Sequence, residues 1–196
     1  IFLVVLFLGG CTVDIPKIPL EDFFKNPEKS SFQLSPNGKK IAYMKPWEDG
    51  NRMMNVYIRD IDSEDEKRIT NASNRSLYGY FWLNDDRIAY IQDKGGDENI
   101  HIYAVNIDGT NDLDLTPFEN IQARITDDLD EDPDYMIVSI NNRDPRVHDA
   151  YRLNVNTGEL SLIAENPGNI MGWMTDNDGK LRIALTSDGV NSSILY

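Results

Sequence analysis

A turn that leads into a short apolar strand is encoded by SPNGKKIAY, residues 35–43, and the pattern recurs three times along the chain. The later copies are LNDDRIAY at 83–90, DPDYMIV at 132–138 and DNDGKLRIAL at 176–185. A spacing of 47, 48 and 47 residues separates the apolar markers Ile41, Ile88, Met136 and Ile183. A second strand follows each copy at a spacing of 46, 48 and 45 residues, centred on Tyr57, Tyr103, Tyr151 and Tyr196.

A period near 46 residues with about four strands per unit is typical of β-propeller blades, so the sequence predicts an all-β propeller. The blades are expected at about 31–72, 78–118, 123–167 and 170–196. Residues 31–196 would then form an incomplete propeller, about three and a half four-stranded blades of a seven- or eight-bladed ring. A two-sheet sandwich would not need the same markers to recur, and a four-bladed ring would need the N-terminal segment to complete its last blade.

Short turns between the strands carry Asn, Asp and Gly. The pairs Asn37-Gly38 and Asp108-Gly109 suit type I′ hairpins, in which both central residues take positive φ. No long stretch shows a sustained helical period, so any helix is expected to be short.

The charge balance excludes one class of partner. The 196 residues include 33 acidic and 19 basic side chains, which gives a net charge of −14. A phosphate-binding protein needs clustered Lys and Arg, so nucleic acid is not expected as a partner. With 40% hydrophobic residues the chain has the composition of a folded protein.

The single cysteine, Cys11, follows an unbroken apolar run at residues 1–8. Eight residues are too few to cross a bilayer, but they suit the apolar part of a secretory signal. Together with LGGC at 8–11 they predict a truncated signal peptide with a lipobox over 1–11, lipid attachment at Cys11 and a tether over 12–30. The alternative is an ordinary buried cysteine beside a core strand.

Several stretches resemble the N-terminal propeller of exported bacterial peptidases of the prolyl oligopeptidase family. The resemblance extends from about residue 18 to 196, and the most specific stretches are NRDP at 142–145 and ENPGN at 165–169. In that family a propeller caps an α/β-hydrolase domain that carries Ser, Asp and His, and it restricts access to short peptides. The resemblance therefore implies a serine peptidase of which this chain is a fragment without the catalytic domain.

Catalytic residues are not expected in this chain. An α/β-hydrolase nucleophile needs a Gly-x-Ser-x-Gly elbow, and the sequence has none. His148 precedes a blade strand and is interpreted as a surface or structural residue. His101 alternates with Ile100 and Ile102 and is expected on the solvent face of a strand.

Two charged segments leave alternatives open. The acidic loop at 127–134 could bind calcium through its oxygens, but it lacks EF-hand spacing, so a solvated connection is favoured and no metal or cofactor is predicted. Arg143, Asp144 and Arg146 either face the peptidase domain or substrate tunnel, or are solvated loop charges.

The expected function is that of a propeller which gates or orients peptide substrates for a downstream hydrolase domain. The expected partners are peptides and, through a lipid anchor in the bacterial cell envelope, a membrane. The alternative is a non-enzymatic, tolB-like propeller lipoprotein that binds a protein or glycan partner.

Overall fold

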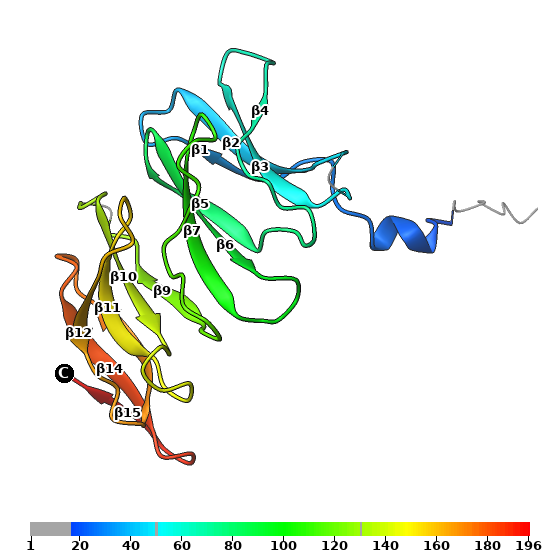
Figure 1. Ribbon diagram of the computed structural model, residues 1–196. Helices are drawn as coiled ribbons and strands as arrows, with labels where there is room; N and C mark the ends of the chain where they lie inside the picture. The colour runs from blue at the N-terminus through cyan, green and yellow to red at the C-terminus, as the bar shows by residue number, and fades with distance from the viewer. Residues whose placement is uncertain (1–16, 50, 130) are drawn as a thin grey trace, which may run out of the picture.

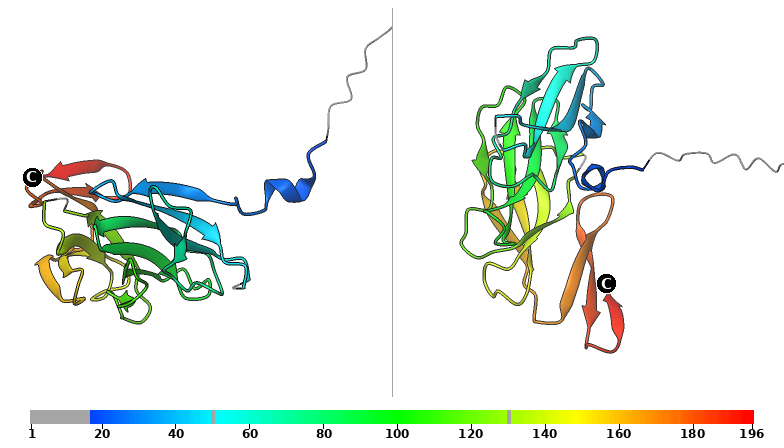
Figure 2. Two further views of the ribbon diagram at one scale, coloured as in Figure 1. Left: turned by 90° about the horizontal axis from the view of Figure 1, so that it is seen from above. Right: turned by 90° about the vertical axis from the view of Figure 1, so that its right-hand side faces the viewer.

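Four antiparallel β-sheets follow one another in chain order in the computed structural model (Figure 1). The structure describes residues 17–49, 51–129 and 131–196. Within them the helical structure is a single 3-10 turn, η1 (Leu20–Phe23), which projects away from the sheets (Figure 2). The predicted all-β propeller class is confirmed. The predicted signal, lipobox and Cys11 lie outside the described residues.

Each sheet is a meander in which consecutive strands pair. The first sheet consists of β1 (Ser30–Leu34), β2 (Lys40–Pro46), β3 (Met54–Asp60) and β4 (Lys67–Arg68). The second consists of β5 (Gly79–Asn84), β6 (Arg87–Asp93), β7 (Ile100–Asn106) and β8 (Leu113–Asp114). The third consists of β9 (Ala123–Asp127), β10 (Tyr135–Ile140), β11 (Asp149–Asn154) and β12 (Leu160–Ala164). The fourth has three strands, β13 (Ile170–Thr175), β14 (Leu181–Ser187) and β15 (Ser192–Leu195).

The type I′ prediction for the turns is wrong. Gly38 and Gly109 have φ of +68° and +78°, whereas Asn37 and Asp108 stay outside the positive-φ region. The Gly38 amide donates to the Ser35 carbonyl at 2.8 Å, so the turn closes around a single left-handed glycine. Asn37 instead uses its side-chain oxygen, which accepts from the Lys39 amide at 2.9 Å. That local bond stabilises the ordinary right-handed conformation of Asn37, so one positive φ is enough.

Two separate apolar cores lie between the first three sheets, and alternate residues of the second sheet enter one core or the other. One core lies between the first and second sheets and is built from side chains such as Val56, Ile88 and Val105, all fully buried. The other lies between the second and third sheets, where Ala89 and Val138 are fully buried. Each buried Val or Ile contributes about 1.5–3 kcal/mol to the free energy of unfolding. Because one blade cannot cover its own faces, stacking provides most of this stability.

The repeat is visible in the aromatic residues of the first two sheets. Tyr43 and Tyr57 stack with ring centroids 6.4 Å apart, and Tyr90 and Tyr103, the corresponding residues of the next sheet, stack at 5.0 Å. The second pair packs against the first sheet, whereas the first pair lies on the side of β2 and β3 opposite the Val56 core.

The fourth sheet is attached mainly by polar contacts. The Trp173 indole Nε1 donates to the His148 carbonyl at 3.0 Å, and the Thr175 hydroxyl donates to Asp127. Apolar side chains of this sheet, such as Met171 (67% exposed) and Ile194 (66% exposed), remain accessible. This junction is therefore more open than the two apolar cores.

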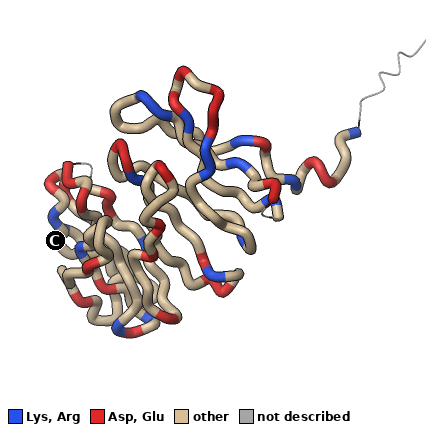
Figure 3. Tube along the Cα trace, turned by 45° about the horizontal axis from the view of Figure 1, so that its top comes forward, with Lys and Arg blue, Asp and Glu red and all other residues tan. Residues whose placement is uncertain are grey.

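Acidic residues gather in the turns and connections between strands (Figure 3). The described part of the chain contains no helix that is both long and apolar enough to span a bilayer.

Candidate functional site

A buried polar residue occupies the same position in each of the first three sheets. Asn55, His101 and Asp149 are spaced by 46 and 48 residues, the spacing of the strand markers. Their exposed fractions are 0%, 2% and 0%. Each one lies near the start of the third strand of its sheet, opposite Lys45, Gln92 and Ile140 respectively. A polar group at such a position must find internal partners, because water cannot reach it.

Asn55 links its strand to the segment that follows β4. Its side-chain amide donates to the Ala72 carbonyl at 2.8 Å, and its side-chain oxygen accepts from the Ala72 amide at 2.7 Å. The Thr70 hydroxyl donates to the same oxygen at 2.8 Å. All the hydrogen-bonding groups of this side chain are therefore used within the blade.

The expectation that His101 lies on a solvent face is wrong. Its Nδ1 lies 3.0 Å from the Asp114 carboxylate, and Thr116 accepts from the Ile102 amide at 3.1 Å. Strict alternation along β7 places His101 on the face opposite Ile102, but that face is not in water, because Tyr103 on the same face packs against the first core. The signal that sequence reasoning missed was the equivalence of His101 to Asn55 in the repeat.

Asp149 forms the corresponding link in the third sheet, with an arginine added. Arg143 donates to both of its carboxylate oxygens, from Nε and Nη2, at 2.7 Å each. The Asn166 amide donates to Asp149 at 2.7 Å, and Arg143 Nη2 also donates to the Asn166 carbonyl at 3.0 Å. Burial opposes ionisation of Asp149, but these hydrogen bonds outweigh it and hold the pKa of Asp149 below its usual value.

The two most specific stretches of the sequence, 142–145 and 165–169, therefore meet in one polar brace. The Asn166 side chain also accepts from the Gly168 and Ile170 amides at 2.9 and 3.1 Å. Arg143, in the loop between β10 and β11, is accordingly a structural residue that holds the turn leading to the fourth sheet. Asp144 and Arg146 pair with each other at 2.7 Å on the exposed side of the same loop, where the Arg146 side chain is 84% exposed.

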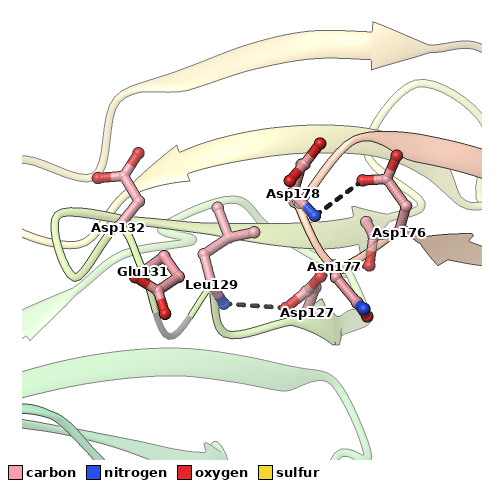
Figure 4. Close-up of a pocket in the computed structure, with 9 residues that line it drawn as sticks. Asp127, Leu129, Glu131, Asp132, Asp176, Asn177 and Asp178 are labelled. Atoms are coloured by element: carbon pink, nitrogen blue, oxygen red, sulfur yellow. Dashed lines mark hydrogen bonds between the residues drawn. The ribbon is translucent and has the colours of Figure 1, made fainter.

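The acidic loop faces the β13–β14 turn across a cavity of about 700 Å³ (Figure 4). Asp127 accepts from the Leu129 amide at 2.9 Å and from the Thr175 hydroxyl. Asp176 accepts from the Asp178 amide at 3.0 Å and from Arg182 Nε at 2.6 Å. The bond from Arg182, together with backbone amides, lowers the pKa of Asp176.

Asp127 and Asp176, on the two sides of this cavity, thus already have protein partners. Asp132, at the other end of the loop, pairs with Arg152. Over the described ranges, no group of three or more His, Cys, Asp or Glu side chains is placed to hold a metal ion. The cavity is a solvated junction between two acidic turns.

A second, smaller hollow lies where β9 meets β13. It is formed by two adjoining pockets of about 330 and 190 Å³ that share Arg124, His148, Ile170 and Met171. Trp173 and Ser139 line the inner pocket. Burial, and to a lesser degree the nearby Arg124 charge, lowers the pKa of His148, so its imidazole is neutral at pH 7. Sequence reasoning did not single out Arg124, because nothing in its local pattern distinguishes it.

The comparisons with known proteins agree with this fold. No protein-family model matches the chain. It is 33% identical over 172 residues, 87% of its length, to dipeptidyl aminopeptidase BIII of Pseudoxanthomonas mexicana, of which it covers 24%. It is 30% identical over 207 aligned positions, 100% of its length, to dipeptidyl peptidase family member 6 of Caenorhabditis elegans, of which it covers 27%. The chain therefore spans about a quarter of the curated relatives it matches.

Solved structures share the fold at low sequence identity. The β-propeller domain of the trilobed protease from Pyrococcus furiosus matches with a TM-score of 0.53 and 14% identity, over 86% of this chain and 56% of that one. TolB from Acinetobacter baumannii matches with a TM-score of 0.51 and 19% identity, over 85% of this chain and 40% of that one.

The fold and its neighbours define the class: this chain is a β-propeller segment. The predicted resemblance to the propeller of prolyl oligopeptidase-family peptidases is confirmed, because the curated homologues of this chain are dipeptidyl peptidases.

Proposed function

We propose that the chain is the propeller part of a prolyl oligopeptidase-like serine peptidase, in which it gates or orients peptide substrates for an α/β-hydrolase domain encoded downstream. The observation that carries the proposal is the 33% identity to dipeptidyl aminopeptidase BIII over 172 residues. The chain itself would contribute no nucleophile, since its sequence lacks the Gly-x-Ser-x-Gly elbow that presents a serine to its base.

Size selection is the physical role that suits such a propeller. Two tightly packed apolar cores make the first three sheets a rigid wall, and a rigid wall excludes folded proteins while short peptides pass. Such a wall would restrict the hydrolase to short peptides. Orientation lowers the activation barrier for hydrolysis only for substrates that fit the site.

The experiment is to sequence and express the whole gene. We expect a Gly-x-Ser-x-Gly elbow followed by Asp and His within roughly 250 residues, the size of a typical single-chain α/β domain. The full-length protein should label with a fluorophosphonate probe and release dipeptides from short peptides, and replacing the elbow serine by Ala should abolish both. A stop codon after further blades, or full-length protein that neither labels nor cleaves, would refute the proposal.

The alternative is a tolB-like propeller lipoprotein that binds a protein or glycan partner in the cell envelope. The likeness to TolB, at a TM-score of 0.51, is the observation that favours it. A gene that encodes only further blades would support this function and exclude the peptidase.

We also propose export to the bacterial cell envelope with a lipid on Cys11, which rests on LGGC at residues 8–11. Cells expressing the full-length protein should incorporate labelled palmitate into it, and Cys11→Ser should prevent this. Incorporation that survives the substitution would show that Cys11 is not the lipidation site.

A further inference from the structure

The hollow between β9 and β13 is distinguished by its charge. In a chain with a net charge of −14, neither of its two adjoining pockets is lined by a carboxylate. The acidic cavity in Figure 4 and the cavity beside Arg143 are both lined by Asp or Glu. A site that keeps acidic side chains away in so acidic a protein suits an anionic ligand.

Arg124 supplies the unpaired positive charge of this hollow, because Arg146, which lines the outer pocket, is already paired with Asp144. Arg124 lies on β9, opposite Ser139 of β10, and its side chain is exposed. Among the residues that the structure describes, no carboxylate lies within ion-pair distance of Arg124, whereas Arg143, Arg146 and Arg152 all have one. Its guanidinium keeps its donors free for a planar, two-oxygen acceptor.

His148 adds a second polar group at the same place. Its backbone carbonyl accepts from Trp173 Nε1 at 3.0 Å and from the Asn166 side chain at 3.4 Å, so the residue is held firmly. Its ring Nε2 is buried and has no hydrogen-bond partner within the described ranges. A buried ring nitrogen without a partner is uncommon, and here it leaves His148 as a fixed part of the wall beside Arg124.

An apolar wall completes the hollow. Met171 is 67% exposed at its rim, and the Trp173 ring lines the inner pocket. Flexible Met and rigid Trp side chains together accommodate the aliphatic part of a peptide next to a polar group.

We propose that this hollow is a carboxylate subsite for the peptide substrate, with Arg124 binding the carboxylate through two N–H groups beside the His148 residue that lines both pockets. The inference rests on the proposed function in that it takes the ligand to be a peptide. Both a C-terminal carboxylate and an acidic side chain have the required chemistry. Arg124 is thus a specificity-determining residue.

The test measures binding directly, by calorimetry on the full-length protein after fluorophosphonate treatment, so that peptide is not consumed. One pair of probes is tetra-alanine with a free C-terminus and its C-terminal amide. The other pair is acetyl-Ala-Glu-Ala-amide and its Gln counterpart. We expect one acidic peptide to bind roughly tenfold or more tightly than its neutral partner, which identifies the source of the carboxylate.

Arg124→Gln should remove this preference. The matched control is Arg152→Gln, because Arg152 lies on the same sheet as Arg124 but is already paired with Asp132, so this variant should keep the preference. Equal binding of acidic and neutral peptides, a preference that survives Arg124→Gln, or equal losses in both variants would overturn the subsite.

A separate cleavage assay distinguishes this failure from that of the peptidase proposal. Protein that cleaves peptides without an Arg124-dependent preference refutes only the subsite. Protein that shows the preference but cleaves nothing refutes only the peptidase.

Discussion

At the scale of single residues, the same position of the repeat takes a different polar side chain in each sheet. Asn55 satisfies its amide with backbone groups, His101 pairs with Asp114, and Asp149 needs Arg143. The position itself requires a buried hydrogen-bonding group that joins the third strand to the fourth strand or to the segment that follows it. The identity of that group then determines which partners the surrounding loops must provide.

The ionic version of this link should be the most sensitive to substitution. Asp149→Asn removes the charge of a fully buried carboxylate that accepts two hydrogen bonds from Arg143, whose own side chain is 42% exposed, so we expect the free energy of unfolding of the full-length protein to fall by about 1–3 kcal/mol. Denaturant unfolding measures the change. Arg146→Gln is the control, because its pair with Asp144 is exposed and solvent screening leaves it little effect on stability. Similar losses in the two variants would contradict the brace.

Glu66 gives the first sheet a pH dependence. Burial disfavours its charge, but hydrogen bonds from Lys29, Lys45 and Tyr43 dominate and lower its pKa to about 2. A carboxyl whose folded pKa lies below its unfolded value stabilises the fold above the unfolded pKa, near 4.5, and loses this effect as the pH falls toward 2.

Glu66→Gln should therefore lower the free energy of unfolding by about 1 kcal/mol at pH 7, a value reduced for solvent screening. The difference from wild type should shrink as the pH falls from 4.5 toward 2. Unfolding curves at both ends of this range provide the measurement. A difference that is independent of pH would show that Glu66 acts through packing rather than charge.

At the scale of elements, each hairpin depends on its own short turn. In the turn between β1 and β2 the left-handed conformation is confined to Gly38, and a Cβ added there would meet nothing within 4 Å. Replacement of this glycine therefore tests backbone conformation without a steric clash.

Gly38→Ala should cost about 1–2 kcal/mol of unfolding free energy, and Gly38→Asn should cost less, because Asn tolerates positive φ. Thermal or denaturant unfolding of both variants measures the difference. Equal costs for the two variants would mean that the turn changes its conformation after substitution.

At the scale of the whole molecule, stacking provides stability but leaves faces uncovered. The first sheet turns Phe32 and Leu34, each 55% exposed, toward solvent, and the fourth sheet exposes Ile194 at 66%. In the second and third sheets the equivalent faces are packed into the two cores.

Residues 17–196 expressed alone should therefore self-associate, because exposed apolar faces and unpaired strand edges attract further chains. Sedimentation at several concentrations measures this. A monodisperse monomer that unfolds cooperatively would instead indicate a closed four-bladed ring.

The same polypeptide should not label with a serine-reactive probe, since it lacks an activated nucleophile.

Local signals explain which features of the fold were predictable. Strand alternation, Gly-containing turns and the marker spacing from Ile41 to Ile183 act over a few residues or repeat along the chain, so they can be read without coordinates. They predict the four sheets and the propeller class. They failed at Asn37, where a side-chain hydrogen bond replaced a second positive φ, and at His101, whose face of the sheet packs against the neighbouring sheet.

The sequence by itself determined the repeat, the strands and the resemblance to peptidase propellers, because each of these features depends on residues that are adjacent or recur at a fixed spacing. Only the tertiary structure decided that stretches 142–145 and 165–169 form one brace, and that Arg124 and His148 share a hollow free of carboxylates. The physical reason is that both features arise where different strands and sheets meet, and such contacts depend on how the blades pack rather than on any local pattern.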